Sequence, residues 1–142
     1  MLIGIDPILN PEILHALRAM GHGDEIVIAD GSFPAETVAR RLVRMEASDM
    51  PRMLRAVLSV LPIDESEPDP VLGMEVIGEP GTIMPAHREI DAALVAATGG
   101  AVTLKRIERY AFYERAKQAF AVIATGERLF YSNVIIRKGT IA

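Results

Sequence analysis

The chain has 142 residues, of which 50% are hydrophobic and 24% are charged, and this composition excludes a disordered or low-complexity protein. We expect one domain, residues 1–142, because a chain of this length can be held by its own hydrophobic core. Cysteine is absent, so a disulfide framework, a thiolate metal site and a thiol nucleophile are excluded. The net charge of −4 disfavours nucleic acid and anionic membranes as partners, and we expect a cytoplasmic protein that does not cross a membrane.

Hydrophobic spacing and turn residues predict helices and strands that alternate along the chain. Asn10 and Ser48 are expected to cap helices, and Gly21 is expected to form a left-handed helix stop. The alternation indicates a single layered α/β sandwich. The expected helices run from Asn10 to Gly21, from Ser48 to Pro62, from about Pro85 to Ala97, and through Glu114 and Lys117. The expected strands are Ile26–Ala29, Val71–Ile77, Val102–Ile107, Phe120–Ala124 and Val134–Ile136.

Several well-known catalytic motifs are missing from the sequence. It contains no phosphate-binding loop, no glycine-rich dinucleotide fingerprint and no Gly-x-Ser-x-Gly elbow. The three histidines, His15, His22 and His87, are not spaced as a helical metal-binding pair. Kinases, Rossmann dehydrogenases, zinc hydrolases and serine hydrolases are therefore disfavoured, and we expect neither a cofactor nor a metal.

Two polar positions flank the strand expected at Ile26–Ala29. His22 lies between two glycines before the strand, where Asp24 could orient its ring, but an ordinary helix end with a surface histidine fits equally well. Asp30 follows the strand, at the edge where α/β sheets bind ligands, although an Asx turn formed by Asp30 and Gly31 also explains it.

Aromatic side chains are concentrated near the carboxyl end of the chain. All the tyrosines and phenylalanines except Phe33 lie between Tyr110 and Tyr131, close to arginine and asparagine side chains. This combination suits a neutral polyol, which needs forked donors, hydroxyl partners and an apolar ring to lie against. The alternatives are structural: the remaining phenylalanines as core, Glu114 to Lys117 as a solvated helix face, and residues 131–133 as a turn. The phenylalanines expected in the core are Phe112, Phe120 and Phe130.

Five short blocks occur in a characteristic order: Gly21-His22-Gly23-Asp24-Glu25, Ala29-Asp30-x-x-Phe33-Pro34, Phe112-Tyr113-Glu114-Arg115-Ala116, Thr125-Gly126-Glu127 and Tyr131-x-Asn133. Together they resemble the fucose mutarotase branch of the ribose pyranase/fucose mutarotase family. The resemblance runs from about Ile8 to Gly139, and the stretch from Ala35 to Met45 matches poorly. The ribose branch typically lacks the block around Tyr113, which places this sequence nearer the fucose branch.

The resemblance implies a ring-like homo-oligomer, for example a decamer, with monosaccharide sites near subunit boundaries. It implies that His22 is the catalytic acid/base and that Tyr113 is a second catalytic residue. Gly31-Ser32 and Ser132 replace the residues usual in the family, so the exact sugar is left open. The sugar-binding residues that the resemblance implies are Asp30, Asp64, Arg109, Tyr131, Ser132 and Asn133.

Exchange of sugar anomers needs only proton transfer. The ring oxygen gains a proton while the anomeric hydroxyl loses one, and a histidine held at hydrogen-bond distance suits both steps. We therefore expect a sugar mutarotase acting on L-fucose or a related monosaccharide. A ribose pyranase-like exchange of ring size is one alternative. A non-catalytic sugar-binding accessory protein is another, and it would have no need of a titrating His22.

Overall fold

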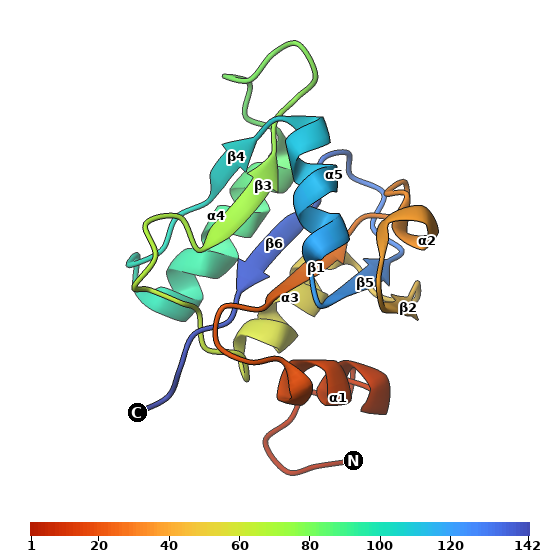
Figure 1. Ribbon diagram of the computed structural model, residues 1–142, viewed down its shortest axis with the longest axis vertical. Coiled ribbons are helices and arrows are strands. Elements are labelled where there is room, and N and C mark those ends of the chain that lie inside the picture. The colour runs from red at the N-terminus through yellow and green to blue at the C-terminus, as the bar shows by residue number, and fades with distance from the viewer.

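Helices and strands alternate along the chain, as the sequence predicts (Figure 1). The computed structural model describes residues 1–142. The helices are α1 (Pro11–Ala19), α2 (Ala35–Val38), α3 (Met50–Leu58), α4 (Pro85–Thr98) and α5 (Arg109–Gln118). The strands are β1 (Glu25–Ala29), β2 (Leu42–Met45), β3 (Val71–Met74), β4 (Lys105–Ile107), β5 (Ala121–Thr125) and β6 (Val134–Arg137).

All the strands form one 6-stranded sheet in the order β2-β5-β1-β6-β3-β4. β5 is parallel to β1 and β2, and β3 is parallel to β4, whereas β6 lies antiparallel between β1 and β3. Every strand except β6 therefore ends at the same edge of the sheet, and β6 begins there. Ligands of open α/β sheets bind beyond the carboxyl ends of the strands, so this edge is the expected place for a site.

Successive side chains of the buried strands enter two different hydrophobic cores. In β1, Ile26 and Ile28 join the larger core, which packs against α1, α3 and α4. Val27 and Ala29 face the smaller core beneath α2 and α5. β1 and β5 are buried along their whole length, which agrees with the apolar runs Ile26–Ala29 and Ala121–Ala124. Figure 1 shows the resulting layers, with α5 on one side of the sheet and α3 and α4 on the other.

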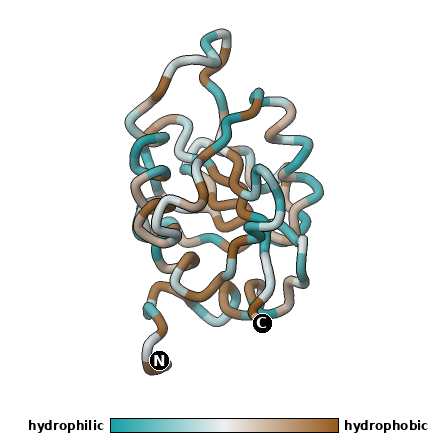
Figure 2. Tube along the Cα trace, turned by 90° about the vertical axis from the view of Figure 1, so that its left-hand side faces the viewer, coloured by the Kyte–Doolittle hydropathy of each residue, from teal (hydrophilic) through white to brown (hydrophobic).

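The apolar parts of the chain run through the interior, and the first residues project from the body (Figure 2). Met1 and Ile3 are fully exposed. None of the helices has the length and apolar character that a membrane crossing requires.

The first helix begins as predicted but ends differently. Asn10 caps it, because the Asn10 side chain accepts a hydrogen bond from the Ile13 N–H at 2.9 Å. The predicted left-handed stop at Gly21 is wrong. Met20 is extended at the helix end (φ −56°, ψ 137°), and the positive φ belongs to Gly23 (85°). The reversal into β1 therefore occurs two residues after the predicted position.

The cap and the end of α3 also differ from the prediction. Asp49 caps the helix instead of Ser48, because the Asp49 carboxylate accepts the Arg52 N–H at 2.8 Å. The Ser48 hydroxyl instead donates to the Asp49 carbonyl. The helix ends at Leu58 and does not reach Pro62.

Two elements were not predicted from the sequence, and two strands are shorter than expected. Helix α2 has 4 residues, too few for a helical period to be visible. Strand β2 is at the edge of the sheet and is only partly buried, so it lacks an apolar run. Strand β3 ends at Met74, before a turn in which Val76 and Glu79 form an isolated bridge, and β4 begins only at Lys105.

Candidate functional site

A cavity of about 410 Å³ lies at the edge of the sheet where most strands end. Its walls come from the segments after β1, β3 and β4 and from the turn before β6. The volume falls within the ~300–1,000 Å³ typical of small-molecule sites. Among its lining residues are Asp30, Arg109, Tyr113, Phe130, Tyr131 and Asn133.

Asp30 and Asn133 form the polar base of this cavity. The Asn133 Nδ2 donates to the Asp30 carboxylate at 3.0 Å, and the Asp30 backbone N–H donates to the Asn133 Oδ1 at 2.9 Å. The Ser32 N–H also donates to this carboxylate, which completes the Asx turn considered for Asp30. Burial raises the pKa of Asp30 above its ordinary value of 3.8, and the hydrogen bonds from Ser32 and Asn133 partly oppose that rise. The turn and the site therefore use the same carboxyl group.

The turn before β6 presents Tyr131 to the cavity. Tyr131 is the non-glycine residue with positive φ (63°), a backbone conformation that is typical of functional sites when the surroundings hold it. Its hydroxyl accepts a hydrogen bond from the Ile77 N–H at 3.3 Å. Tyr131 therefore links its turn to the loop after β3.

Ser132 lies behind the cavity and does not line it. Its side chain is fully buried, and its Oγ has no hydrogen-bond partner within the chain. The Ser132 backbone instead helps to lower the pKa of Asp30, against the effect of burial. In this structure Ser132 acts on the cavity through its main chain.

The turn before β6 is supported by an adjacent block of the sequence, Thr125, Gly126 and Glu127. The Thr125 hydroxyl donates to the Ala29 carbonyl at 2.8 Å, which joins the ends of β5 and β1. A Cβ atom at Gly126 would collide with the Glu46 carbonyl oxygen, so only glycine fits at this crossing. The Glu127 carboxylate then accepts the backbone N–H groups of residues 128 and 129. This block of the sequence is therefore a scaffold for the site.

Arg109 and Tyr113 form the wall contributed by α5. The Arg109 guanidinium donates to the Tyr110 hydroxyl at 2.7 Å and stacks 4.6 Å from the centre of the Tyr110 ring. The Arg109 Nε is buried and has no partner within the chain. Tyr113 packs edge-on against Phe33, with 5.6 Å between ring centres. Arg109 thus brings a positive charge to the cavity wall, although its Nε is itself buried.

Two sequence interpretations near α5 and β6 need correction. Phe112 is a core residue as predicted, but Phe130 is 68% exposed and lines the mouth of the cavity. Phe120 is partly buried and packs against the larger core, in agreement with the prediction. Arg115 is not simply part of a solvated face, because its guanidinium makes a forked ion pair with the nearly buried Glu25.

His22 and Asp64 lie at the opposite edge of the sheet. They line a second cavity of about 470 Å³, and the His22 Nε2 is 3.1 Å from the Asp64 Oδ2. Asp24 does not orient the His22 ring, as the sequence suggested it could, because its carboxylate accepts the Gly21 N–H at 2.7 Å. The ring contacts a carboxylate that is 42 residues away in the sequence.

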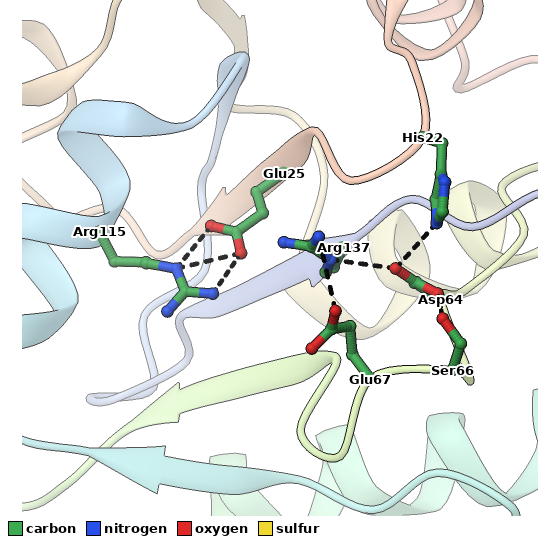
Figure 3. A network of polar contacts seen from close by, with 7 residues as sticks. All are labelled: His22, Glu25, Asp64, Ser66, Glu67, Arg115 and Arg137. Atoms are coloured by element: carbon green, nitrogen blue, oxygen red, sulfur yellow. Dashed lines mark hydrogen bonds and ion pairs between the residues drawn. The ribbon is translucent and has the colours of Figure 1, made fainter.

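Asp64 is at the centre of a polar network (Figure 3). Its Oδ1 accepts the Ser66 hydroxyl at 2.6 Å, and its Oδ2 accepts the Arg137 Nε–H at 3.0 Å. The hydrogen bond from Ser66, followed by those from Arg137 and His22, lowers the pKa of Asp64 to about 2. Asp64 is therefore ionised at any pH near neutrality.

The whole chain matches one protein family. The model of the RbsD / FucU transport protein family covers residues 3–141. The chain belongs to this family. It is 44% identical to the human fucose mutarotase, over 99% of this chain and 95% of the human protein.

Two solved structures are similar to this protein in fold. FucU from Bifidobacterium longum has a TM-score of 0.92 and 39% identity over 98% of this chain and 99% of its own. The fucose mutarotase of Streptococcus pneumoniae in complex with L-fucose has a TM-score of 0.86 and 33% identity, over 99% of this chain and 100% of its own.

The site residues predicted for this RbsD/FucU protein fall into two groups within one chain. Asp30, Arg109, Tyr113, Tyr131 and Asn133 meet at the first cavity. His22 and Asp64 lie together at the second. The two groups are separated by the length of β1, which is about 16 Å at the usual rise of a strand.

Sequence reasoning missed Arg137, which contacts Asp64 from the end of β6. The only sequence signal was Gly23, the second glycine beside His22. A Cβ at Gly23 would lie 3.0 Å from an Arg137 guanidinium nitrogen, so the glycine leaves room for that side chain.

Proposed function

We propose that this protein interconverts the α and β anomers of L-fucose, as a cofactor-independent isomerase. The observation that carries the proposal is the hydrogen-bonded pair of Asp30 and Asn133 at the base of a cavity of monosaccharide scale, whose other walls are largely apolar. Relatives named fucose mutarotase match almost the whole chain, and one of them was solved in complex with L-fucose. A cytoplasmic location stays a prediction from the sequence.

The sugar would bind in the cavity that contains Asp30. The buried Asp30 carboxylate offers acceptors that are held in place by Ser32 and Asn133, and Asn133 brings a second polar group. The Arg109 guanidinium lines the cavity and can donate to a sugar oxygen, and the exposed Phe130 ring can cover an apolar sugar face. Tyr131 adds a hydroxyl that both donates and accepts. Ser132 contributes through its backbone.

The reaction needs one proton delivered to the ring oxygen and one removed from the anomeric hydroxyl. Opening the ring gives an aldehyde, rotation about the adjacent C–C bond exposes its other face, and closure inverts the anomeric carbon. His22 is the proposed acid/base group, since a histidine can both give and take a proton near neutral pH. Tyr113, which lines the cavity, is the proposed second proton-transfer group.

A site that uses both His22 and Asp30 requires two copies of the chain, because β1 separates these residues within one copy. We propose a ring-like homo-oligomer in which His22 of the partner subunit faces the cavity with Asp30. The apolar side chains that surround the mouth of this cavity support this arrangement. Ile77 and Phe130 are each more than half exposed in the isolated chain and would be covered by a neighbour.

Two other functions could use the same cavity. A ribose pyranase-like exchange of ring size would use the same proton transfers, and Ser32, where the sequence departs from the usual pattern, lines the cavity. A non-catalytic sugar-binding protein would use the cavity with Asp30 but would not need His22. The sugar preference and the presence of chemistry separate these three functions.

The test is saturation-transfer NMR on the anomeric protons of fucose, ribose, rhamnose and galactose. We expect micromolar protein to speed exchange between the anomers of L-fucose without changing their equilibrium ratio. A larger effect on ribose ring forms would favour the pyranase. Exchange at the rate of the buffer blank with every sugar, together with detectable binding, would favour the accessory protein.

A further inference from the structure

The His22 ring does not stand alone at its cavity. Asp64 Oδ2 is the acceptor shared by two groups, the His22 Nε2 at 3.1 Å and the Arg137 Nε at 3.0 Å (Figure 3). The Asp64 carboxylate is 4% exposed, whereas the His22 side chain is 55% exposed. A buried anchor therefore holds one nitrogen of an accessible imidazole.

We propose that Asp64 and Arg137 are positioning residues for proton transfer by His22. Arg137 fixes the Asp64 carboxylate, the carboxylate binds the His22 Nε2–H, and the His22 Nδ1 is left as the nitrogen that exchanges a proton with the sugar. This inference rests on the proposed mutarotase function, and it changes the role of Asp64 from sugar ligand to support of the histidine.

Hydrogen-bond capacity favours this role for Asp64. Its carboxylate already accepts from Ser66, Arg137 and His22, so little capacity is left for a sugar hydroxyl. Its pKa of about 2 means that it remains an anion and cannot itself act as the acid near neutral pH. An ionised carboxylate beside Nε2 selects the ring tautomer that carries its proton there.

Arg137 sets how strongly the carboxylate acts on the ring. It shares the charge of Asp64 and also lies 3.8 Å from the Glu67 carboxylate. The other charged group at this cavity is Glu65. Gly23 leaves room for the Arg137 guanidinium, because a Cβ atom there would lie 3.0 Å from one of its terminal nitrogens. The glycine after His22 thus has a physical purpose that the sequence alone does not reveal.

Because Asp64 and Arg137 carry opposite charges, removing each charge should shift the pH midpoint of the exchange rate in the opposite direction. Asp64→Asn removes an anion that favours the protonated imidazole, so the pH midpoint of the anomer-exchange rate should fall. Arg137→Gln leaves that anion uncompensated, so the midpoint should rise. Each shift should be about half a pH unit, as expected for a partly exposed charge pair. Arg137→Lys keeps the charge and should stay closer to the wild-type protein.

Arg115→Gln is the matched control. It breaks the forked ion pair with Glu25, which lies beside the network without contacting Asp64 or His22 (Figure 3). It should reduce stability but leave the pH midpoint unchanged. A purely structural role for Arg137 predicts that Arg137→Gln behaves in the same way.

The second readout is the pH titration of the His22 C2–H resonance by NMR, which needs no sugar. We expect Asp64→Asn and Arg137→Gln to move its midpoint in opposite directions. Shifts of the same sign, or no shift in either variant, would overturn the proposal. If Arg137→Gln does not fold, an unchanged midpoint in Asp64→Asn overturns it alone. A wild-type protein without exchange activity would refute the mutarotase function, while the ring titration would still show whether the network acts on His22.

Discussion

Asn133 and Asp30 are 103 residues apart in the sequence, yet they are joined by two hydrogen bonds. The Asn133 amide donates to the Asp30 carboxylate and accepts from the Asp30 backbone, so one side chain satisfies both groups. This pair connects the end of β1 to the start of β6 at the base of the cavity. Binding capacity and stability are therefore coupled at this position.

Asn133→Ala should lower the free energy of unfolding by about 1–3 kcal/mol, because it leaves a buried backbone N–H without a partner. It should also weaken sugar binding. Urea denaturation and sugar titration measure the two effects. Gln118→Ala is the control, since the Gln118 amide makes only an exposed hydrogen bond with Arg40 and should change stability by less than about 0.5 kcal/mol. Equal losses in the two variants would contradict the structural role of Asn133.

The two carboxyl groups of the site should affect acid stability with opposite signs. The pKa of Asp64 is lowered to about 2 from an ordinary 3.8, so Asp64 stabilises the fold above that ordinary value. This stabilisation is lost as the pH falls towards the folded-state value. Burial raises the pKa of Asp30, so its stabilising contribution is present below 3.8 and is lost as the pH rises through the raised value.

Asp64→Asn should therefore lose less stability than the wild-type protein between about pH 5 and pH 2. Asp30→Asn should lose more stability on acidification than the wild-type protein. In the wild-type protein, protonation of Asp30 stabilises the fold and partly offsets the loss of stability at low pH, and the variant lacks this contribution. Urea midpoints across a pH series give both slopes. Parallel pH profiles for the two variants would be inconsistent with the environments of these carboxyl groups.

Gly126→Ala should disrupt the support beneath the turn of the site. The added methyl group meets the Glu46 carbonyl oxygen, which is backbone and cannot simply rotate away. We expect a loss of at least about 1–3 kcal/mol, as for overpacking elsewhere. Gly81→Ala meets no atom within 4 Å and should be nearly neutral. Thermal unfolding compares the two variants, and a neutral Gly126→Ala would show that the crossing of the two segments is adaptable.

The part of the site at the strand ends could be predicted from the sequence. The short apolar run before Asp30 indicates a buried strand, and such strands direct their carboxyl ends to the ligand edge of an α/β sheet. The sequence could not show that Asp64 contacts His22. That contact depends on the isolated bridge between Ile63 and Lys138, which brings distant segments together.

Side-chain type was a poor guide where long-range contacts decide the environment. Phe130 is an apolar residue that the fold leaves exposed at the cavity mouth. Arg115 is on a helix rich in charge but reaches Glu25, 90 residues away. The Asp49 cap was missed because the adjacent Ser48 is an equally good capping type, and only the backbone geometry distinguishes them.

His22→Gln and Asp30→Asn should separate catalysis from binding. Glutamine keeps hydrogen-bonding groups but cannot titrate, so the exchange rate should fall roughly 10²–10⁴-fold, or about 3–5 kcal/mol of barrier. Asp30→Asn keeps the shape but removes a charged acceptor, and its main effect should be on affinity, about 1.5–3 kcal/mol. Anomer-exchange NMR at varied sugar concentration measures both. Wild-type rates for His22→Gln would make Tyr113 the next residue to test.

Mixing these two variants should restore activity at a sugar concentration low enough for each variant alone to be impaired, because His22 and Asp30 lie at opposite ends of β1. If the site forms between copies, the His22→Gln copy still has an intact Asp30 and the Asp30→Asn copy still has an intact His22. A contact between the two can therefore contain one complete site. Random assembly of equal amounts should produce such sites at about one contact in four, and recovered activity should approach a quarter of the wild-type value. The variants are unfolded together and refolded, and each variant refolded alone is the control. Recovery no greater than that of the separate variants would mean that both residues must come from the same chain, and the two-copy site would be rejected.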